Sequence, residues 1–136
     1  MTLPKALHEI IHDFEALDSK TEKYEELLHY ADKLPHFPGE LRTKDNLVAG
    51  CQSVVHVYAE AIDNELVLAA DADSHLVKGL CAVFVLGFQG SDAKVFSTLE
   101  PTFLKELGLE ESLTPSRANA SLNIFKLLQE QVKRQV

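Results

Sequence analysis

The chain has 136 residues, 46% of them hydrophobic and 25% charged, which is ordinary for a globular protein and predicts a single domain over residues 1–136. The formal net charge of −8 argues against a nucleic-acid partner, because such proteins carry basic patches and the longest basic run here is Lys133-Arg134. The longest apolar run, residues 79–88, is too short to cross a bilayer, so no membrane partner is expected.

The N-terminal residues and the cysteines predict a cytoplasmic protein. Residues 1–14 have the pattern of an amphipathic helix rather than of a signal peptide, because charged residues such as Glu9 and Asp13 interrupt the apolar positions. Two cysteines without an export signal predict reduced thiols and no disulfide. Cys51 and Cys81 lack Cys-x-x-Cys spacing and the six histidines are scattered, so neither a metal site nor a cofactor is expected.

The N-terminal part of the chain predicts two antiparallel helices followed by a loop. Apolar residues recur at helical spacing from Leu3 to Leu17. Ser19 and Glu22 then form a capping box that begins a second helix, and Pro35 ends that helix. Pro38-Gly39 and the polar residues 40–46 predict a connecting loop.

A β-hairpin is predicted next. Residues 54–61 alternate between apolar and polar side chains, with His56 and Tyr58 on the face opposite to the apolar one. Asp63-Asn64 is a turn signal, and residues 66–70 return as a second strand. The two strands should therefore pair in the antiparallel direction.

The remainder of the chain predicts helices. Asp73 or Ser74 is the candidate cap of a helix that extends to residue 88, and its second half, which begins at Cys81, is apolar on all sides and should be buried centrally. A short helix is predicted over residues 92–98. Thr114-Pro115 signals the start of the last helix, which should extend to about residue 133. The predicted fold class is α+β, with a small antiparallel β-sheet packed against several helices.

The tetrapeptide Gly50-Cys51-Gln52-Ser53 is the most informative feature of the sequence. It stands where a polar loop enters the first predicted strand, a position that exposes a sulfur atom, and Gly50 permits a tight turn there. From the residues alone, a small buried hydrophobe remains the alternative interpretation of Cys51. Cys81 is the contrasting case, because its apolar helical surroundings predict a structural and inert thiol.

Two other residues are candidates for chemistry. Arg117 falls in the first turn of the last helix, where the helix dipole disfavours a cation, so it is either a surface residue or one paired with an anionic group. His56 is either a satisfied strand histidine or, if the loop folds back, a neighbour of Cys51. No acidic residue stands in an obvious orienting position, so little supports a Cys-His hydrolase.

Three segments carry a resemblance to a known family. The sequence VAGCQSVV over residues 48–55 resembles the active-loop motif of the SufE family of sulfur-acceptor proteins. Asp73 followed by LVKGL over residues 76–80, and LTPSR over residues 113–117, resemble two further motifs of that family in the same order and spacing. The resemblance covers nearly the whole chain. The chain departs from the family at three positions, where an aromatic residue, an alanine and a glycine are usual: His56, Ser74 and Ala120.

The resemblance implies a SufE/IscU-like fold and a sulfur relay. A pyridoxal-phosphate-dependent cysteine desulfurase (SufS- or CsdA-like) would transfer sulfur to Cys51 as a persulfide, its turnover would rise, and the sulfur would pass to an iron–sulfur scaffold. Asp73 and Arg117 carry over as candidate contacts to the loop or the partner, and His56 is a further candidate. Two alternatives stay open, a docking adaptor that acts without covalent transfer and a scaffold that binds a metal or cluster. The oligomeric state is also left open, a homodimer included.

Overall fold

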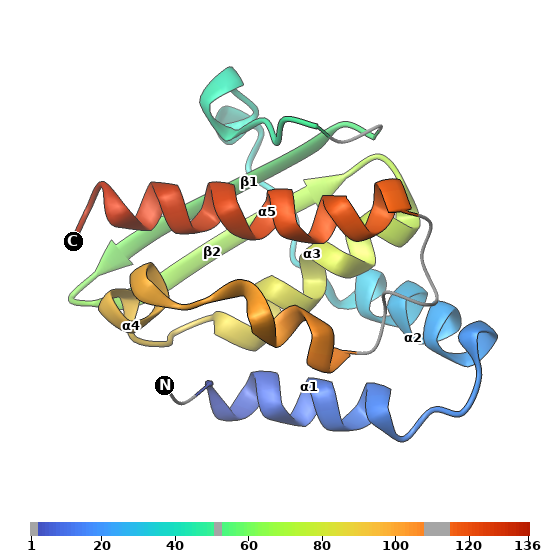
Figure 1. The fold of residues 1–136 in the computed structure, drawn as a ribbon. Coiled ribbons are helices and arrows are strands. Elements are labelled where there is room, and N and C mark those ends of the chain that lie inside the picture. The colour runs from blue at the N-terminus through green and yellow to red at the C-terminus, as the bar shows by residue number, and fades with distance from the viewer. Residues whose placement is uncertain (1–2, 51–52, 108–114) are drawn as a thin grey trace.

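The computed structural model describes residues 3–50, 53–107 and 115–136. Figure 1 shows a β-hairpin with helices gathered around it, which confirms the predicted α+β class. The elements in chain order are α1 (Lys5–Glu15), α2 (Lys20–Lys33), β1 (Val55–Ile62), β2 (Glu65–Ala72), α3 (His75–Phe88), α4 (Ala93–Thr98) and α5 (Pro115–Lys133). Short 3-10 turns lie at η1 (Gly39–Leu41), η2 (Lys44–Asn46) and η3 (Pro101–Leu107).

The first two helices form as predicted, with one difference at the capping box. The Ser19 hydroxyl oxygen accepts from the Glu22 backbone N–H at 3.1 Å and caps α2. The Glu22 carboxylate accepts from the Ser19 hydroxyl, whereas the capping-box pattern predicts that it accepts from the Ser19 backbone N–H. The helix ends at Lys33, before Pro35, because proline can neither donate its hydrogen bond nor fit within a helix.

The β-hairpin has a single register, from Val55 opposite Ala72 to Ile62 opposite Glu65. The two connecting residues, Asp63-Asn64, have φ values of 51° and 63°, which is the type I′ geometry that suits the right-handed twist of paired strands. Along β1 the buried and partly exposed side chains alternate, so the predicted division into an apolar inner face and a polar outer face is confirmed.

Glutamine side chains occupy the outer edges of both strands. Gln131 of α5 accepts from the Ala59 N–H at 2.8 Å, and Gln135 accepts from the Ala61 N–H at 2.8 Å and donates to the Ala59 carbonyl at 2.9 Å. Gln89 forms the equivalent pair of bonds with Leu68 of β2. These amides satisfy backbone groups that an edge strand would otherwise expose, and they fix α5 alongside β1. Figure 1 shows the two elements running together.

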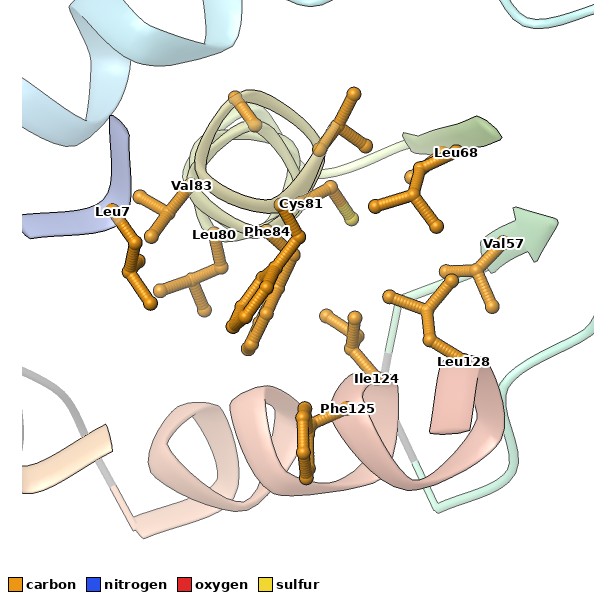
Figure 2. Close-up of a cluster of buried hydrophobic side chains, with 14 of the residues drawn as sticks. Leu7, Val57, Leu68, Leu80, Cys81, Val83, Phe84, Ile124, Phe125 and Leu128 are labelled. Carbon is orange, nitrogen blue, oxygen red and sulfur yellow. The ribbon is translucent and has the colours of Figure 1, made fainter. Parts of the chain in front are cut away.

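Helix α3 is the buried centre of the molecule, as its all-round apolar sequence predicts. Figure 2 shows its side chains between the inner face of the sheet and α5, with Phe84 and Phe125 stacked at 6.3 Å between ring centroids. On another side α3 packs against α2 so closely that Gly79 lies against the backbone of Leu27.

Three boundaries go beyond or differ from the sequence-based expectations. Ser74, not Asp73, caps α3, since its hydroxyl accepts from the Val77 N–H. The η3 turn was not predicted, and the proposed cap at Thr114 lies outside the described residues. In the described ranges, no helix has the length and apolar character needed to cross a membrane.

The α2–α3 contact generates a stability prediction. A Cβ at Gly79 would lie 2.2 Å from the Leu27 carbonyl oxygen, and backbone atoms cannot move away as a flexible side chain can. Gly79→Ala should therefore destabilise the fold by about 3 kcal/mol or more. Gly39→Ala is the control, because nothing lies within 4 Å of a Cβ there, and it should change stability by less than about 0.5 kcal/mol. Urea unfolding of both variants measures the difference, and equal midpoints would contradict this packing.

Candidate functional site

A short stem closes the loop that contains the Gly50-Cys51-Gln52-Ser53 tetrapeptide. The Val48 N–H donates to the Val55 carbonyl at 2.9 Å, and Leu47 pairs with His56 as an antiparallel bridge. Residues 49–54 are therefore a loop whose ends are joined at the beginning of β1. Cys51 and Gln52 lie outside the described residues.

Asp73 anchors the C-terminal end of this loop. Its carboxylate accepts from the Val54 N–H at 3.0 Å, and its own N–H donates to the Val54 carbonyl at 3.1 Å. Both polar backbone groups of Val54 are thus held by one residue. Because Ser74 caps α3, the carboxylate of Asp73 is available for the loop, and its interpretation as a helix cap is wrong.

The outer face of the sheet next to the stem carries an aromatic contact. The Phe37 side chain is 2% exposed, and its ring centroid lies 6.2 Å from that of His56. The Arg42 guanidinium covers Phe37 at 5.2 Å from the ring centroid. His56 Nδ1 is buried and has no hydrogen-bond partner among the described residues. His56 therefore occupies the strand position that the sequence predicts, but among the described residues its Nδ1 is not satisfied as the interpretation of a satisfied strand histidine requires, and its ring contacts Phe37.

A cationic cluster surrounds Asp71, which lies directly opposite His56 in the hairpin. Arg42 Nη2 donates to one carboxylate oxygen of Asp71, and Lys78 Nζ lies 3.6 Å from the other. Burial tends to raise the pKa of Asp71, but the hydrogen bond from Arg42, the Ala72 backbone N–H and the charge of Lys78 outweigh it and lower the pKa below its ordinary value. Two cations, Arg42 and Lys78, therefore lie against one carboxylate in a chain whose net charge is −8.

The other sequence candidates are placed differently. Cys81 is fully buried in α3, and Figure 2 shows it surrounded by apolar side chains from the sheet and α5. Arg117 lies in the first turn of α5, but its side chain is outside the described residues and its role stays a prediction. Sequence reasoning missed Phe37 and Arg42, because a lone aromatic residue and a lone arginine in a polar loop carry no periodic signal.

A second feature, an apolar pocket of about 310 Å³, lies beside α4, lined by Pro4, Phe88, Ser91, Asp92, Val95, Phe96 and Leu99. The polar side chains that line it, those of Ser91 and Asp92, are already hydrogen-bonded to backbone groups. The Ser91 hydroxyl donates to the Phe88 carbonyl, and Asp92 caps α4. Nothing in the described part of the pocket provides an activated nucleophile. In the described ranges, no three residues of the types His, Cys, Asp and Glu gather as metal ligands would. Cys51 is outside those ranges, so the cluster-scaffold hypothesis stays untested.

The anchor at Asp73 can be tested by hydrogen exchange. Asp73→Ala removes the acceptor of the Val54 N–H, so exchange at Val54 should accelerate by about two- to tenfold, the change that corresponds to losing one hydrogen bond. Asp73→Asn keeps an acceptor oxygen and should have a smaller effect. Unchanged exchange at Val54 in Asp73→Ala would show that the carboxylate does not hold the loop.

The Arg42–Asp71 pair makes a pH-dependent contribution to stability. The pKa of Asp71 is lower in the folded protein than in the unfolded chain, so the pair stabilises the fold above the unfolded pKa, and this contribution is lost as pH falls through the folded pKa. Asp71→Asn should cost about 1 kcal/mol near pH 6 and progressively less toward pH 3. Glu130→Gln, which breaks the exposed Arg134 pair, is the control and should change the unfolding free energy by about 0.5 kcal/mol or less. A cost for Asp71→Asn that is constant from pH 6 to pH 3 would contradict the assignment.

Comparison with known proteins gives one consistent result. The family model described as "SufE: Fe-S metabolism associated domain" matches residues 8–132. An uncharacterized SufE-like protein of Synechocystis sp. is 39% identical over 128 residues, which cover 94% of this chain and 80% of that protein. SufE-like protein 1, chloroplastic/mitochondrial, of Arabidopsis thaliana is 40% identical over 93% of this chain, which spans only 34% of the plant protein.

Two more distant proteins extend the comparison. The cysteine desulfuration protein SufE of Plasmodium falciparum is 31% identical over 76% of this chain and 43% of its own length. The solution structure of a hypothetical protein from Thermus thermophilus superposes with a TM-score of 0.83 at 25% identity, covering 98% of this chain and 97% of that one. The match of the family model over most of the chain, together with these relatives, shows that the chain belongs to the SufE family and has a role in iron–sulfur metabolism.

Proposed function

We propose that this protein accepts sulfur from a cysteine desulfurase onto Cys51 and passes it on for iron–sulfur cluster assembly. The observation that carries the proposal is the loop of residues 49–54, closed by the Val48–Val55 stem and tied to Asp73, in a chain of the SufE family. The described residues on both sides of Cys51 are held by these hydrogen bonds at the beginning of β1. The name of the Plasmodium relative, a cysteine desulfuration protein, supports the same chemistry.

The proposed transfer is a thiol–persulfide exchange without net oxidation. The Cys51 thiolate attacks the outer sulfur of the persulfide on the desulfurase and forms a new S–S bond. The S–S bond within the desulfurase persulfide breaks, and its electron pair leaves with the cysteine of the enzyme as a thiolate. The proton released by the Cys51 thiol balances the charge. A second exchange of the same kind would pass the sulfur to the next acceptor.

The cluster around Asp71 supports the anionic steps of this reaction. A thiolate and a persulfide anion are both stabilised by positive charge, and the two cationic side chains next to the loop stem are Arg42 and Lys78, each paired with Asp71. The chain as a whole carries a net charge of −8, so two cations side by side are unusual on its surface. We assign Asp73 the role of loop anchor, Arg117 that of a contact to the loop or the partner, and His56 that of an aromatic support through Phe37.

Desulfurase turnover separates the covalent carrier from the docking adaptor. Wild-type protein should raise the rate of alanine formation from L-cysteine in the absence of reductant, and Cys51→Ser should abolish this stimulation. Cys81→Ala is the matched control, because it removes the other, buried thiol without introducing a hydroxyl, and it should stimulate like wild type. Circular dichroism would confirm that both variants fold. Full stimulation by Cys51→Ser would contradict the carrier and favour the adaptor.

A further inference from the structure

Polar side chains recur at regular spacing along the C-terminal part of the chain. Asn123 and Gln131 of α5, and Gln135 just beyond the end of that helix, are separated by multiples of four residues, so they follow one slowly turning stripe. Gln131 and Gln135 contact the outer edge of β1 through the hydrogen bonds described above. Because α5 and β1 run in the same direction, the N-terminal end of the stripe lies toward the beginning of the strand and its loop. Asn123 is the polar residue at that end.

Asn123 contacts the loop at Gly50. A Cβ on Gly50 would lie 2.9 Å from Asn123 Nδ2, closer than real Cβ atoms approach other heavy atoms, so the terminal amide of Asn123 occupies the space beside Gly50. Gly50 also has a φ of 80°, in the left-handed region that favours glycine. The backbone conformation therefore favours glycine immediately before Cys51, and a side chain there would also require the terminal amide of Asn123 to move.

The contact completes a set of restraints on the loop. The Val48–Val55 stem closes it at its base, Asp73 holds Val54 on the C-terminal side, and Asn123 bounds Gly50 on the N-terminal side. The start of β1, the segment that leads into α3, and α5 thus each contribute one restraint. Asn123 is also separate from the core, since its partly buried side chain lies outside the group of fully buried residues that holds α5 in place.

We propose that Asn123 is a positioning residue for the thiol of Cys51, acting through its contact with Gly50. This inference rests on the proposed function, because it assigns Asn123 a role in presenting the thiol to a sulfur donor. Asn123 does not react and does not touch the transferred sulfur. Asn123 limits the conformations of Gly50. The thiol of the next residue, Cys51, then has fewer orientations available besides the one in which it reacts with the sulfur donor.

The first test measures the loop itself. In Asn123→Ala, hydrogen exchange in the segment 48–54 should accelerate by about two- to tenfold, because one local restraint is lost. Exchange in β1 beyond residue 57 and the unfolding midpoint should stay close to wild type. Lys126→Gln is the matched control, because Lys126 lies on the exposed side of the same helix. Unchanged exchange of the loop in Asn123→Ala would overturn the inference.

A double-mutant cycle tests whether the effect passes through Gly50. Gly50→Ala places a methyl group against Asn123, so it should slow sulfur capture from the desulfurase and alter the rate at which iodoacetamide modifies Cys51. Removing the Asn123 side chain relieves this overlap, so Gly50→Ala/Asn123→Ala should be less impaired than the product of the two single effects. Strictly multiplicative effects on both rates would show that the residues do not interact and would overturn the inference.

The two readouts keep this inference distinct from the proposed function. Hydrogen exchange and the rate of Cys51 alkylation are measured on the protein alone and do not require a desulfurase. If Asn123→Ala alters both but neither wild type nor any variant captures sulfur, the positioning of the loop stands and the sulfur-carrier function fails. If wild type captures sulfur and Asn123→Ala behaves like Lys126→Gln in every assay, the carrier function stands and the role of Asn123 is overturned.

Discussion

The open edges of a two-stranded sheet are the constraint on which this structure depends. A lone β-hairpin is marginally stable in water, and each of its strands exposes a row of unpaired backbone groups. Here the side-chain amides of Gln131, Gln135 and Gln89 take the place of neighbouring strands. They satisfy part of each edge, and Gln131 and Gln135 hold α5 along β1, while α3 covers the inner face. Helix α5, which bonds the edge of β1 through Gln131, also contacts the loop through Asn123.

The same arrangement connects fold and chemistry. The beginning of β1 is where the loop of residues 49–54 leaves the sheet, so whatever fixes the strand also fixes the base of that loop. Asn46 links the preceding segment to the same system, because it accepts a hydrogen bond from Gln131 and donates one to the Leu41 carbonyl. The segment before Asn46 also contains Arg42, whose guanidinium donates a hydrogen bond to Asp71. The segment that contains Arg42 is therefore connected, through Asn46 and Gln131, to the contact between α5 and β1.

Much of this was predictable from sequence, and the exceptions have physical reasons. Local signals were sufficient for the hairpin turn at Asp63-Asn64 and for the burial of α3, because each depends on a few adjacent residues. Asp73 was ambiguous, since an acidic residue before a helix satisfies the same pattern whether it caps the helix or, as here, holds Val54. Gln131 and Asn123 gave no signal, because their partners are strand and loop atoms far away in the chain. The placement of Cys51 rests on its motif and its described neighbours alone.

The most direct test of the account is peptide mass spectrometry of the protein after incubation with a cysteine desulfurase and L-cysteine in the absence of reductant. A gain of one or more sulfur atoms on the peptide that contains Cys51, with the Cys81 peptide unmodified, is the result that the account predicts, since one thiol lies in an anchored loop and the other is fully buried. An unmodified Cys51 while the desulfurase turns over would contradict it.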